Sequence, residues 1–267
     1  MVFPEIELRK FASMGRELGA SWEAASTPFM KFEGGKAIAH VGVLELPLWI
    51  MGQPVQAAGI HAVATHPKFR RQGHYRDCIE AALEYCNTRY KTLILTTPQP
   101  ELYYPFGFRR VLESAFTVSC KVTPQKDGFR VLNLHHENDR TLLHRLLDTR
   151  RPISNVVGVL SEKPVFLVNE ASRPLYYAED LDTLVVMEQE GDRLHIFDVV
   201  ADHALSLIEI LRCIPDPVKE VILYFSPDRL EPKAQAIPQV LENAYLMVRG
   251  SFAAEGQSFM MPRSARC

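Results

Sequence analysis

The chain has 267 residues, of which 47% are hydrophobic, and its formal net charge is −2 at pH 7. This length suits one large domain or two modest ones, with enough apolar residues for a core. The small net charge gives no general attraction to nucleic acid or to an anionic membrane, so we expect neither as a partner. We find no run of about 18 apolar residues and no apolar segment typical of a signal peptide near the start.

Cysteine and histidine usage argues against disulfides and metal sites. The cysteines are odd in number, scattered and without a C-x-x-C pair; they are Cys78, Cys86, Cys120, Cys213 and Cys267. This pattern favours reduced thiols in a cytoplasmic protein. The histidines lack the spacing of metal ligands, so we expect no metal.

The first part of the chain predicts an antiparallel meander. Residues 4–25 have a helical pattern, interrupted at Gly15 and Gly19. Three strands are expected after it, and they are 28–33, 36–49 and 54–65. The turn signals between them, Gly34-Gly35 and Met51-Gly52-Gln53, are short enough to join neighbouring antiparallel strands.

A basic loop then separates an apolar strand from a helix. The apolar run Ile60–Thr65 ends before Pro67, and the loop Lys68–Gly73 contains three basic residues. A helix pattern begins near His74. A strand that leads through a basic, glycine-containing loop to a helix N-terminus predicts a phosphate-binding site. The alternative is a solvated basic loop in which Gly73 only caps the helix.

The helix after the loop has the clearest pattern in the sequence. Its apolar stripe is formed by Tyr75, Cys78, Ile79, Ala82, Leu83 and Cys86. Thr92–Thr96 predicts the next strand. Since strand, helix and strand follow one another, we expect 60–65 and 92–96 to be parallel neighbours. Two further strands are expected at 108–112 and 115–122.

The second half repeats this order of elements. Residues 123–128 are the best linker candidate. Beyond them we expect helices at 139–148 and 204–211, and strands at 165–168, 175–187, 193–200, 220–225 and 245–249. The repetition predicts two domains, 1–124 and 125–267.

The loop sequence resembles the GNAT superfamily of N-acetyltransferases, whose signature is Arg/Gln-x-x-Gly-x-Gly/Ala. Arg70 and Gly73 match this signature, whereas Tyr75 stands where the family has a small residue. The segments VATHPKFRRQGH and LYYPFGF resemble the enhanced-intracellular-survival branch in particular. The resemblance covers about residues 28–120 and rests on element order beyond them. It implies an α/β GNAT fold with a mixed, mostly antiparallel sheet, splayed parallel central strands, and two tandem GNAT-like domains.

The resemblance also implies acetyl-CoA as co-substrate. In the family, backbone groups of the strand contact the pantetheine arm, and amides of the loop and helix hold the pyrophosphate. The matching cofactor-binding residues are Val63, Ala64, Thr65, Arg70, Arg71, Gln72, Gly73, His74, Tyr75 and Arg76. The longer members end in a sterol-carrier-like domain, which we expect to be absent from this chain.

Two residues are candidates for catalysis. Tyr103 lies four residues before Gly107, where the family has the tyrosine that protonates the leaving thiolate. A phenol with a pKa of about 10 suits this task. Tyr103 and Tyr104 could instead only pack their rings, and Tyr104 is the alternative acid. His61 is the candidate base, because regular alternation places it on the same face as Val63. Glu33 and Glu45, acting through water, are alternatives.

We therefore expect an N-acetyltransferase that transfers acetyl from acetyl-CoA to a primary amine by direct attack in a ternary complex. The acceptor would be a small-molecule or peptide amine, and a homo-oligomer is an open alternative. The second repeat has Ala201, Asp202 and His203 in place of the basic loop, so we expect no CoA there. Two other hypotheses stay open: a non-catalytic acyl-CoA-binding or regulatory protein, and transfer of another acyl group.

Overall fold

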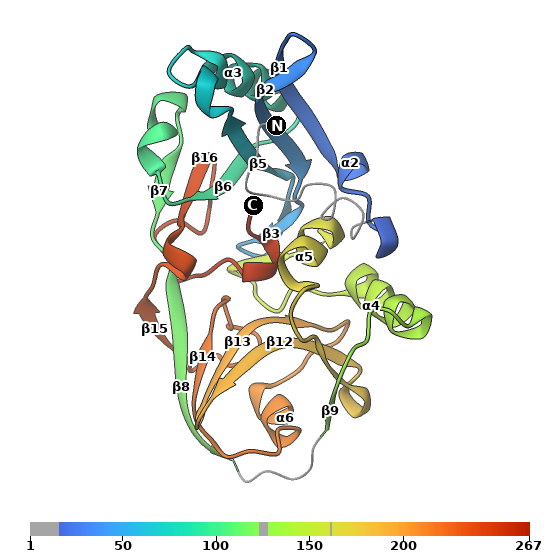
Figure 1. Cartoon of the computed structure of the whole chain (residues 1–267). Coiled ribbons are helices and arrows are strands. Elements are labelled where there is room, and N and C mark those ends of the chain that lie inside the picture. The colour runs from blue at the N-terminus through green and yellow to red at the C-terminus, as the bar shows by residue number, and fades with distance from the viewer. Residues whose placement is uncertain (1–15, 123–127, 161) are drawn as a thin grey trace.

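The computed structural model describes residues 16–122, 128–160 and 162–267. One mixed sheet and helix α3 form the upper part of the molecule, and a second mixed sheet with three helices forms the lower part (Figure 1). The strands of the upper sheet, in spatial order, are β1 (Ser26–Glu33), β2 (Lys36–Glu45), β5 (Ala57–Thr65), β6 (Thr92–Thr97), β16 (Tyr245–Gly250) and β7 (Arg109–Val111). Those of the lower sheet are β15 (Gln235–Pro238), β8 (Ser114–Val122), β14 (Val218–Leu223), β13 (Arg193–Val200), β12 (Thr183–Glu190), β11 (Tyr176–Ala178) and β9 (Phe129–Val131).

The remaining elements connect or cover these sheets. A small sheet has the order β10 (Val157–Val159), β3 (Leu48–Ile50) and β4 (Gln53–Val55). The α-helices are α2 (Trp22–Ala25), α3 (His74–Asn87), α4 (Glu137–Thr149), α5 (Lys163–Glu170) and α6 (Leu207–Arg212). The 3₁₀ turns nearest the site are η1 (Pro67–Phe69), η2 (Pro100–Leu102) and η3 (Tyr104–Phe106). Over the described residues, no helix is both long and apolar enough to cross a membrane.

The predicted meander is confirmed in part. Gly34 and Gly35 both have positive φ, 53° and 73°, as the tight turn between β1 and β2 requires. The prediction of one strand over 36–49 was wrong, because β2 ends at Glu45 and Pro47 lies before β3. Proline has no amide to donate to a sheet, so the chain leaves the upper sheet there. Residues 4–15 of the predicted helix over 4–25 lie outside the described residues. Within the described part, Arg16 and Glu17 are helical, a turn follows, and α2 covers Trp22–Ala25.

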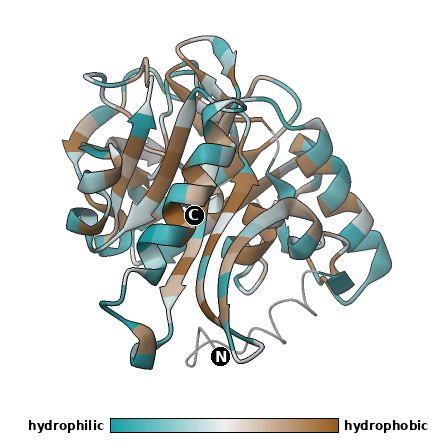
Figure 2. Cartoon of the chain, turned by 90° about the horizontal axis from the view of Figure 1, so that it is seen from above, coloured by the Kyte–Doolittle hydropathy of each residue, from teal (hydrophilic) through white to brown (hydrophobic). Residues whose placement is uncertain are grey.

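The strand–helix–strand unit is confirmed. β5 and β6 are parallel, but their ladder covers only Ala57–Gly59 opposite Thr92–Ile94, and the strands part beyond it. The predicted splay is therefore present. A bulge accompanies it, since Ala62 has φ 49° and the register with β2 shifts beside it. Viewed from above, apolar strands lie behind α3, whose outward surface is largely hydrophilic (Figure 2).

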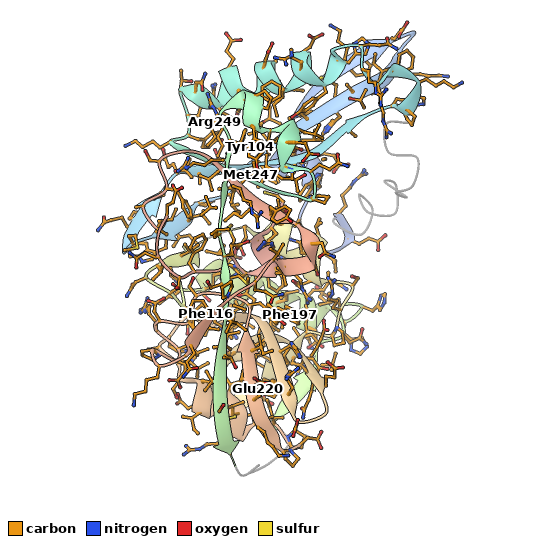
Figure 3. All side chains as sticks on the ribbon, turned by 90° about the vertical axis from the view of Figure 1, so that its left-hand side faces the viewer. Tyr104, Phe116, Phe197, Glu220, Met247 and Arg249 are labelled. Carbon is orange, nitrogen blue, oxygen red and sulfur yellow. The ribbon has the colours of Figure 1, made fainter. Side chains whose placement is uncertain are left out.

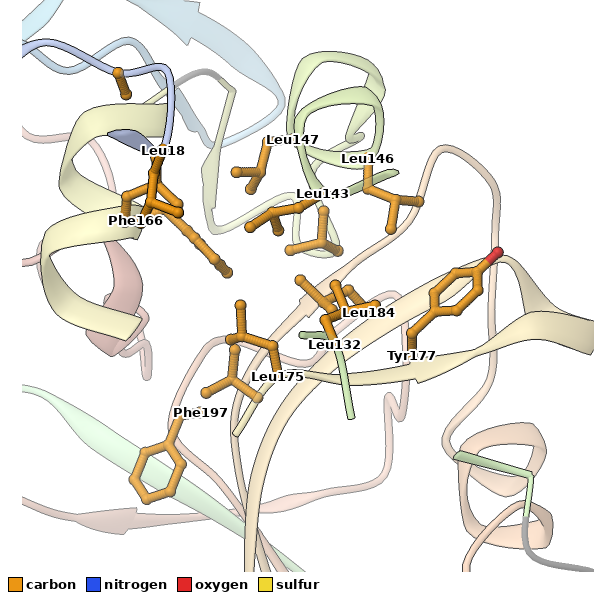
Figure 4. Packing of buried hydrophobic residues seen from close by; sticks show 14 of the residues in the cluster. Leu18, Leu132, Leu143, Leu146, Leu147, Phe166, Leu175, Tyr177, Leu184 and Phe197 are labelled. Atoms are coloured by element: carbon orange, nitrogen blue, oxygen red, sulfur yellow. The ribbon is translucent and has the colours of Figure 1, made fainter. Parts of the chain in front are cut away.

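The lower sheet repeats this plan, as the sequence predicted. β13 and β14 are parallel over Arg193–Ile196 opposite Glu220–Leu223, and α6 lies in the connection between them. On the other side of the sheet, α4 and α5 supply leucines and Phe166, which pack onto Leu175 and Leu184 (Figure 4). The strand predicted at 165–168 is wrong, because α5 occupies it. A short apolar run does not distinguish a buried helix from a buried strand.

The sheets exchange strands across the predicted domain boundary. β8 precedes residue 124 but lies in the lower sheet, and β16 follows it but lies between β6 and β7. Accordingly, Met247 and Arg249 lie in the upper part of the molecule, whereas Phe116 lies in the lower part (Figure 3). The division of the chain at residue 124 stays a prediction. Each sheet contains strands from both sides of that position.

The last residues, 259–267, run between the two sheets, and we call them the tail. The C-terminus marker lies at the centre of the molecule (Figure 1). The tail is almost entirely buried, including Arg263 and Ser264, which are 5% and 0% exposed. Arg263 pairs with buried Glu170 at 2.9 Å, and Arg266 pairs with buried Glu113 at 2.6 Å. The tail therefore connects the two halves through charged groups that are shielded from water.

Candidate functional site

A pocket of about 1100 Å³ lies at the N-terminal end of α3. It is bounded by β5, the basic loop, the first turn of α3 and the segment 99–106. Its lining includes nine of the ten predicted cofactor-binding residues, which are Val63, Ala64, Thr65, Arg70, Arg71, Gly73, His74, Tyr75 and Arg76. Gln72 is the exception, and its side-chain amide donates to the carbonyl oxygen of Lys68 at 3.2 Å. The structure thus brings these residues together, while their role stays a prediction.

The loop geometry exposes backbone amides to this pocket. Gly73 is the N-cap of α3 with φ 87°, and no side chain caps the helix there. The first-turn amides of a helix have no partner within the helix and carry a partial positive charge. Arg71 has φ 63°, a left-handed conformation that costs a non-glycine residue about 1–3 kcal/mol and is often found at functional sites. The loop is therefore shaped to bind an anion.

Positively charged side chains surround these amides. Arg70 donates from Nε to the carbonyl oxygen of Thr65 at 3.2 Å, which holds it beside the end of β5. The guanidinium of Arg76 lies 5.3 Å from the ring centre of Phe106, on the opposite wall. Glu101 is the acidic residue of the lining. The excess of cations favours a ligand with negative charge.

Tyr75 joins the two walls of the pocket. Its hydroxyl donates to the carbonyl oxygen of Leu102 at 3.2 Å. Its ring meets Phe106 and Tyr103 edge to face, with centroid distances of 5.5 and 6.2 Å. Burial, with a smaller contribution from Tyr103, raises the pKa of Tyr75. The larger side chain at this signature position therefore bridges α3 and the segment 99–106.

Tyr103 lies behind this wall rather than in the pocket lining. It links η2 to η3, is 7% exposed, and packs against Tyr75 and Phe108. Burial raises the pKa of Tyr103 to about 12. Its hydroxyl is therefore protonated at neutral pH and is able to donate a proton. The alternative, Tyr104, is 50% exposed.

His61 lies away from the pocket. It is 6% exposed, its Nε2 lies 2.7 Å from the hydroxyl of Ser26, and its ring meets Trp22 edge to face at 4.8 Å. Burial, and secondarily His40, lowers the pKa of His61 to about 4. Trp22 packs against the buried apolar residues on one face of the upper sheet. Val63 packs against the buried apolar residues on the opposite face, which α3 covers. The expectation that His61 and Val63 share a face was wrong, since the bulge at Ala62 interrupts the alternation.

The two alternative bases are also outside the pocket lining. Glu45 accepts a hydrogen bond from the hydroxyl of Tyr90 at 3.2 Å, at the far end of β2. Glu33 is exposed beside the β1–β2 turn. The structure therefore brings neither carboxylate to the pocket at the start of α3.

The residue that lies between the parted strands, Cys267, is not among the predicted site residues. The main-chain oxygen of Cys267 accepts hydrogen bonds from the amide and the hydroxyl of Thr96, at 2.6 and 2.8 Å. On the other side, its sulfur lies against Gly59, in the space that a Cβ would occupy. Cys267 lies 171 positions after Thr96, so local sequence patterns do not predict this contact; the only local sign of it is a glycine within an apolar strand.

The corresponding gap in the lower sheet is filled by the tail. Asp198 lies on β13 beyond the residues that pair with β14. It is fully buried and accepts hydrogen bonds from Ser264 and Arg150. Ser226, just after β14, exchanges hydrogen bonds with the backbone of Met260. The tail therefore occupies the lower gap with its earlier residues and reaches the upper gap with Cys267.

The comparisons with known proteins agree with this geometry. Residues 24–111 match the family model described as the acetyltransferase (GNAT) domain. The matched region contains the meander, the basic loop, α3 and β6. Residues 24–111 are therefore similar to the GNAT acetyltransferase domain, and this match spans about a third of the chain. None of the curated protein sequences matches the chain.

Three solved structures show the same fold. A conserved protein from Enterococcus faecalis V583, described as a "Probable N-Acyltransferase", has a TM-score of 0.59 and 15% identity, with 95% of this chain and 67% of that chain covered. Eis1 from Mycobacterium abscessus has a TM-score of 0.53 and 14% identity, with 91% and 70% covered. A GCN5-related N-acetyltransferase from Anabaena variabilis ATCC 29413 has a TM-score of 0.51 and 15% identity, with 89% and 64% covered. The chain thus spans about two thirds of their length.

Proposed function

We propose that this protein transfers an acetyl group from acetyl-CoA to a primary amine. The main support for the proposal is the N-terminus of α3, which has no side-chain cap and can bind an anion through its first-turn amides. It lies within the region that matches the GNAT acetyltransferase domain. In this arrangement the pyrophosphate of CoA binds the first-turn amides of α3, with Arg71 as the charged partner. The pantetheine arm follows Val63–Thr65 into the gap between β5 and β6.

The proposed chemistry is direct transfer in a ternary complex. The amine nitrogen attacks the thioester carbonyl carbon, a C–N bond forms, and the C–S bond breaks. The CoA thiolate takes the proton of the Tyr103 hydroxyl, and the nitrogen loses its extra proton to a base or to water. The phenol is protonated at neutral pH at its usual pKa, and burial raises the pKa of Tyr103 further, which keeps the proton on the phenol but makes it a weaker acid toward the thiolate. The base is not assigned, and His61 stays a prediction.

We infer one acyl-CoA site in the chain, carried by the first half. The lower sheet has the same strand–helix–strand plan, but Asp202 follows β13 where Arg70 and Arg71 follow β5. An acid at that place repels phosphate, and the tail fills the lower gap. In this view the lower half is a degenerate second domain that supports the first.

A calorimetric titration with acetyl-CoA tests the proposal. We expect binding to the wild type, and binding at least tenfold weaker to Arg71→Asn, because asparagine keeps the left-handed backbone but loses the charge. Lys68→Gln is the matched control, since Lys68 is an exposed cation of the same loop outside the pocket lining. If the folded wild type binds no acetyl-CoA, the proposal is wrong.

A second measurement separates transfer from binding alone. CoA release is followed with a panel of aminoglycosides, polyamines, lysine-containing peptides and peptide N-termini. Release with at least one amine identifies the acceptor class. Tight binding without release for any amine supports the alternative of a non-catalytic acyl-CoA-binding protein.

A further inference from the structure

We propose that Cys267 is a positioning residue that bridges β5 and β6 and thereby sets the width of the gap in which the thioester reacts. This inference rests on the proposed function for its kinetic consequence. The bridge itself rests on contacts of Gly59, Thr96 and the tail, and these are measurable without a ligand.

On the β6 side, the bridge replaces strand pairing. The parallel ladder ends at Ile94, two residues before Thr96. The amide of Thr96 donates to the main-chain oxygen of Cys267 at 2.6 Å, rather than to a backbone group of β5. The hydroxyl of Thr96 donates to the same oxygen at 2.8 Å. A backbone donor that would favour further pairing of β5 with β6 is thus satisfied by the tail.

On the β5 side, the bridge needs a glycine. Gly59 is the last paired residue of β5, and the sulfur of Cys267 lies where its Cβ would stand. The next contacts of such a Cβ, with Cys267 Cβ and Leu44, are ordinary at 3.4 Å. The backbone of Gly59 has no positive φ, so alanine is strained there only by Cys267. Gly59 and Cys267 therefore fit each other as a pair.

The bridge is held firmly from behind. Arg266, the neighbour of Cys267, donates to Glu113 from both terminal nitrogens, at 3.0 and 2.6 Å. The side-chain amide of Asn169, on α5, donates to the carbonyl oxygens of Arg263, Ser264 and Arg266. Since these anchors are mostly buried, the position of Cys267 follows the packing of the lower half. The lower half thus contributes to the site by fixing the bridge.

Paired substitutions test the bridge. Gly59→Ala should displace Cys267, so the amide hydrogen of Thr96 should exchange with deuterium at least tenfold faster without ligand. Turnover of acetyl-CoA should fall at least tenfold. In Gly59→Ala/Cys267→Gly the clash is gone while the tail backbone remains. Exchange and turnover should then return to within threefold of Cys267→Gly alone.

The outcomes separate the two proposals. If the wild type binds no acetyl-CoA, the proposed function fails, while exchange at Thr96 still reports on the bridge. If folded Gly59→Ala keeps the wild-type exchange rate and turnover, the bridge is rejected. If Gly59→Ala does not fold, Thr96→Val takes its place, because valine keeps the shape but loses the hydroxyl donor. Faster exchange at residue 96 then supports the bridge, and an unchanged rate rejects it.

Discussion

Arg266 and Glu113 form an ion pair inside the molecule, with side chains only 8% and 3% exposed. Glu113 lies between β7 of the upper sheet and β8 of the lower sheet, and burial raises the pKa of its carboxyl group even beside Arg266. Arg266→Met should lower the free energy of unfolding by about 3–5 kcal/mol, because it leaves a buried carboxylate without its partner. Urea unfolding measures this change.

The double variant Arg266→Met/Glu113→Leu is the control for that prediction. Replacing both charges by apolar groups removes the unpaired carboxylate, so most of the lost stability should return. A double variant as unstable as Arg266→Met would mean that packing of the arginine, rather than its charge, supports the tail.

Tyr103→Phe should lower turnover by about 10²–10⁴-fold, the usual contribution of a general acid. Affinity for acetyl-CoA should not change, since Tyr103 lies outside the pocket lining. Steady-state kinetics with calorimetry separates the two quantities. Tyr104→Phe is made in parallel, and a large loss there with none in Tyr103→Phe would assign the proton donor to Tyr104.

Tyr75→Phe should lower the free energy of unfolding by about 0.5–1 kcal/mol, because only its hydrogen bond to Leu102 is lost. Tyr75→Ala also removes the ring contacts with Tyr103 and Phe106, so the segment 99–106 should become more mobile. Hydrogen exchange of residues 100–106 measures this. Equal exchange in the alanine variant and the wild type would show that Tyr75 does not join the two walls.

His61 should make the protein less stable in acid. Its pKa is about 4 in the folded protein, against about 6.5 when unfolded, so the unfolded state binds more protons between these values. The free energy of unfolding therefore falls as pH decreases from 6.5 to 4, by roughly 3 kcal/mol from this residue. Urea unfolding of His61→Gln between pH 7 and pH 4.5 should show a smaller loss than the wild type. An unaltered slope in His61→Gln would refute the assignment.

Local patterns were enough to predict the site's framework. The apolar stripe of α3, the basic loop and the glycine N-cap depend on neighbouring residues, and the structure has all three. The place of β16 and the bridge of Cys267 depend on contacts between residues far apart in the chain. The periodicity of local sequence does not predict such contacts. The wrong face for His61 followed from one bulge at Ala62, because a single inserted residue reverses every later side chain.

The position of β16 also constrains how the protein is made. Its residues, Tyr245–Gly250, separate β6 from β7, so the upper sheet is incomplete until that segment leaves the ribosome. At a synthesis rate of about 5–20 residues per second, well over 100 further residues must be made before β16 is available to pair with β6. One edge of β6 stays unpaired until then. The apolar positions of β6 are exposed in that interval to other nascent chains. We therefore expect expression of residues 1–124 alone to give aggregated material, and newly made protein to depend on chaperones before it can bind any ligand.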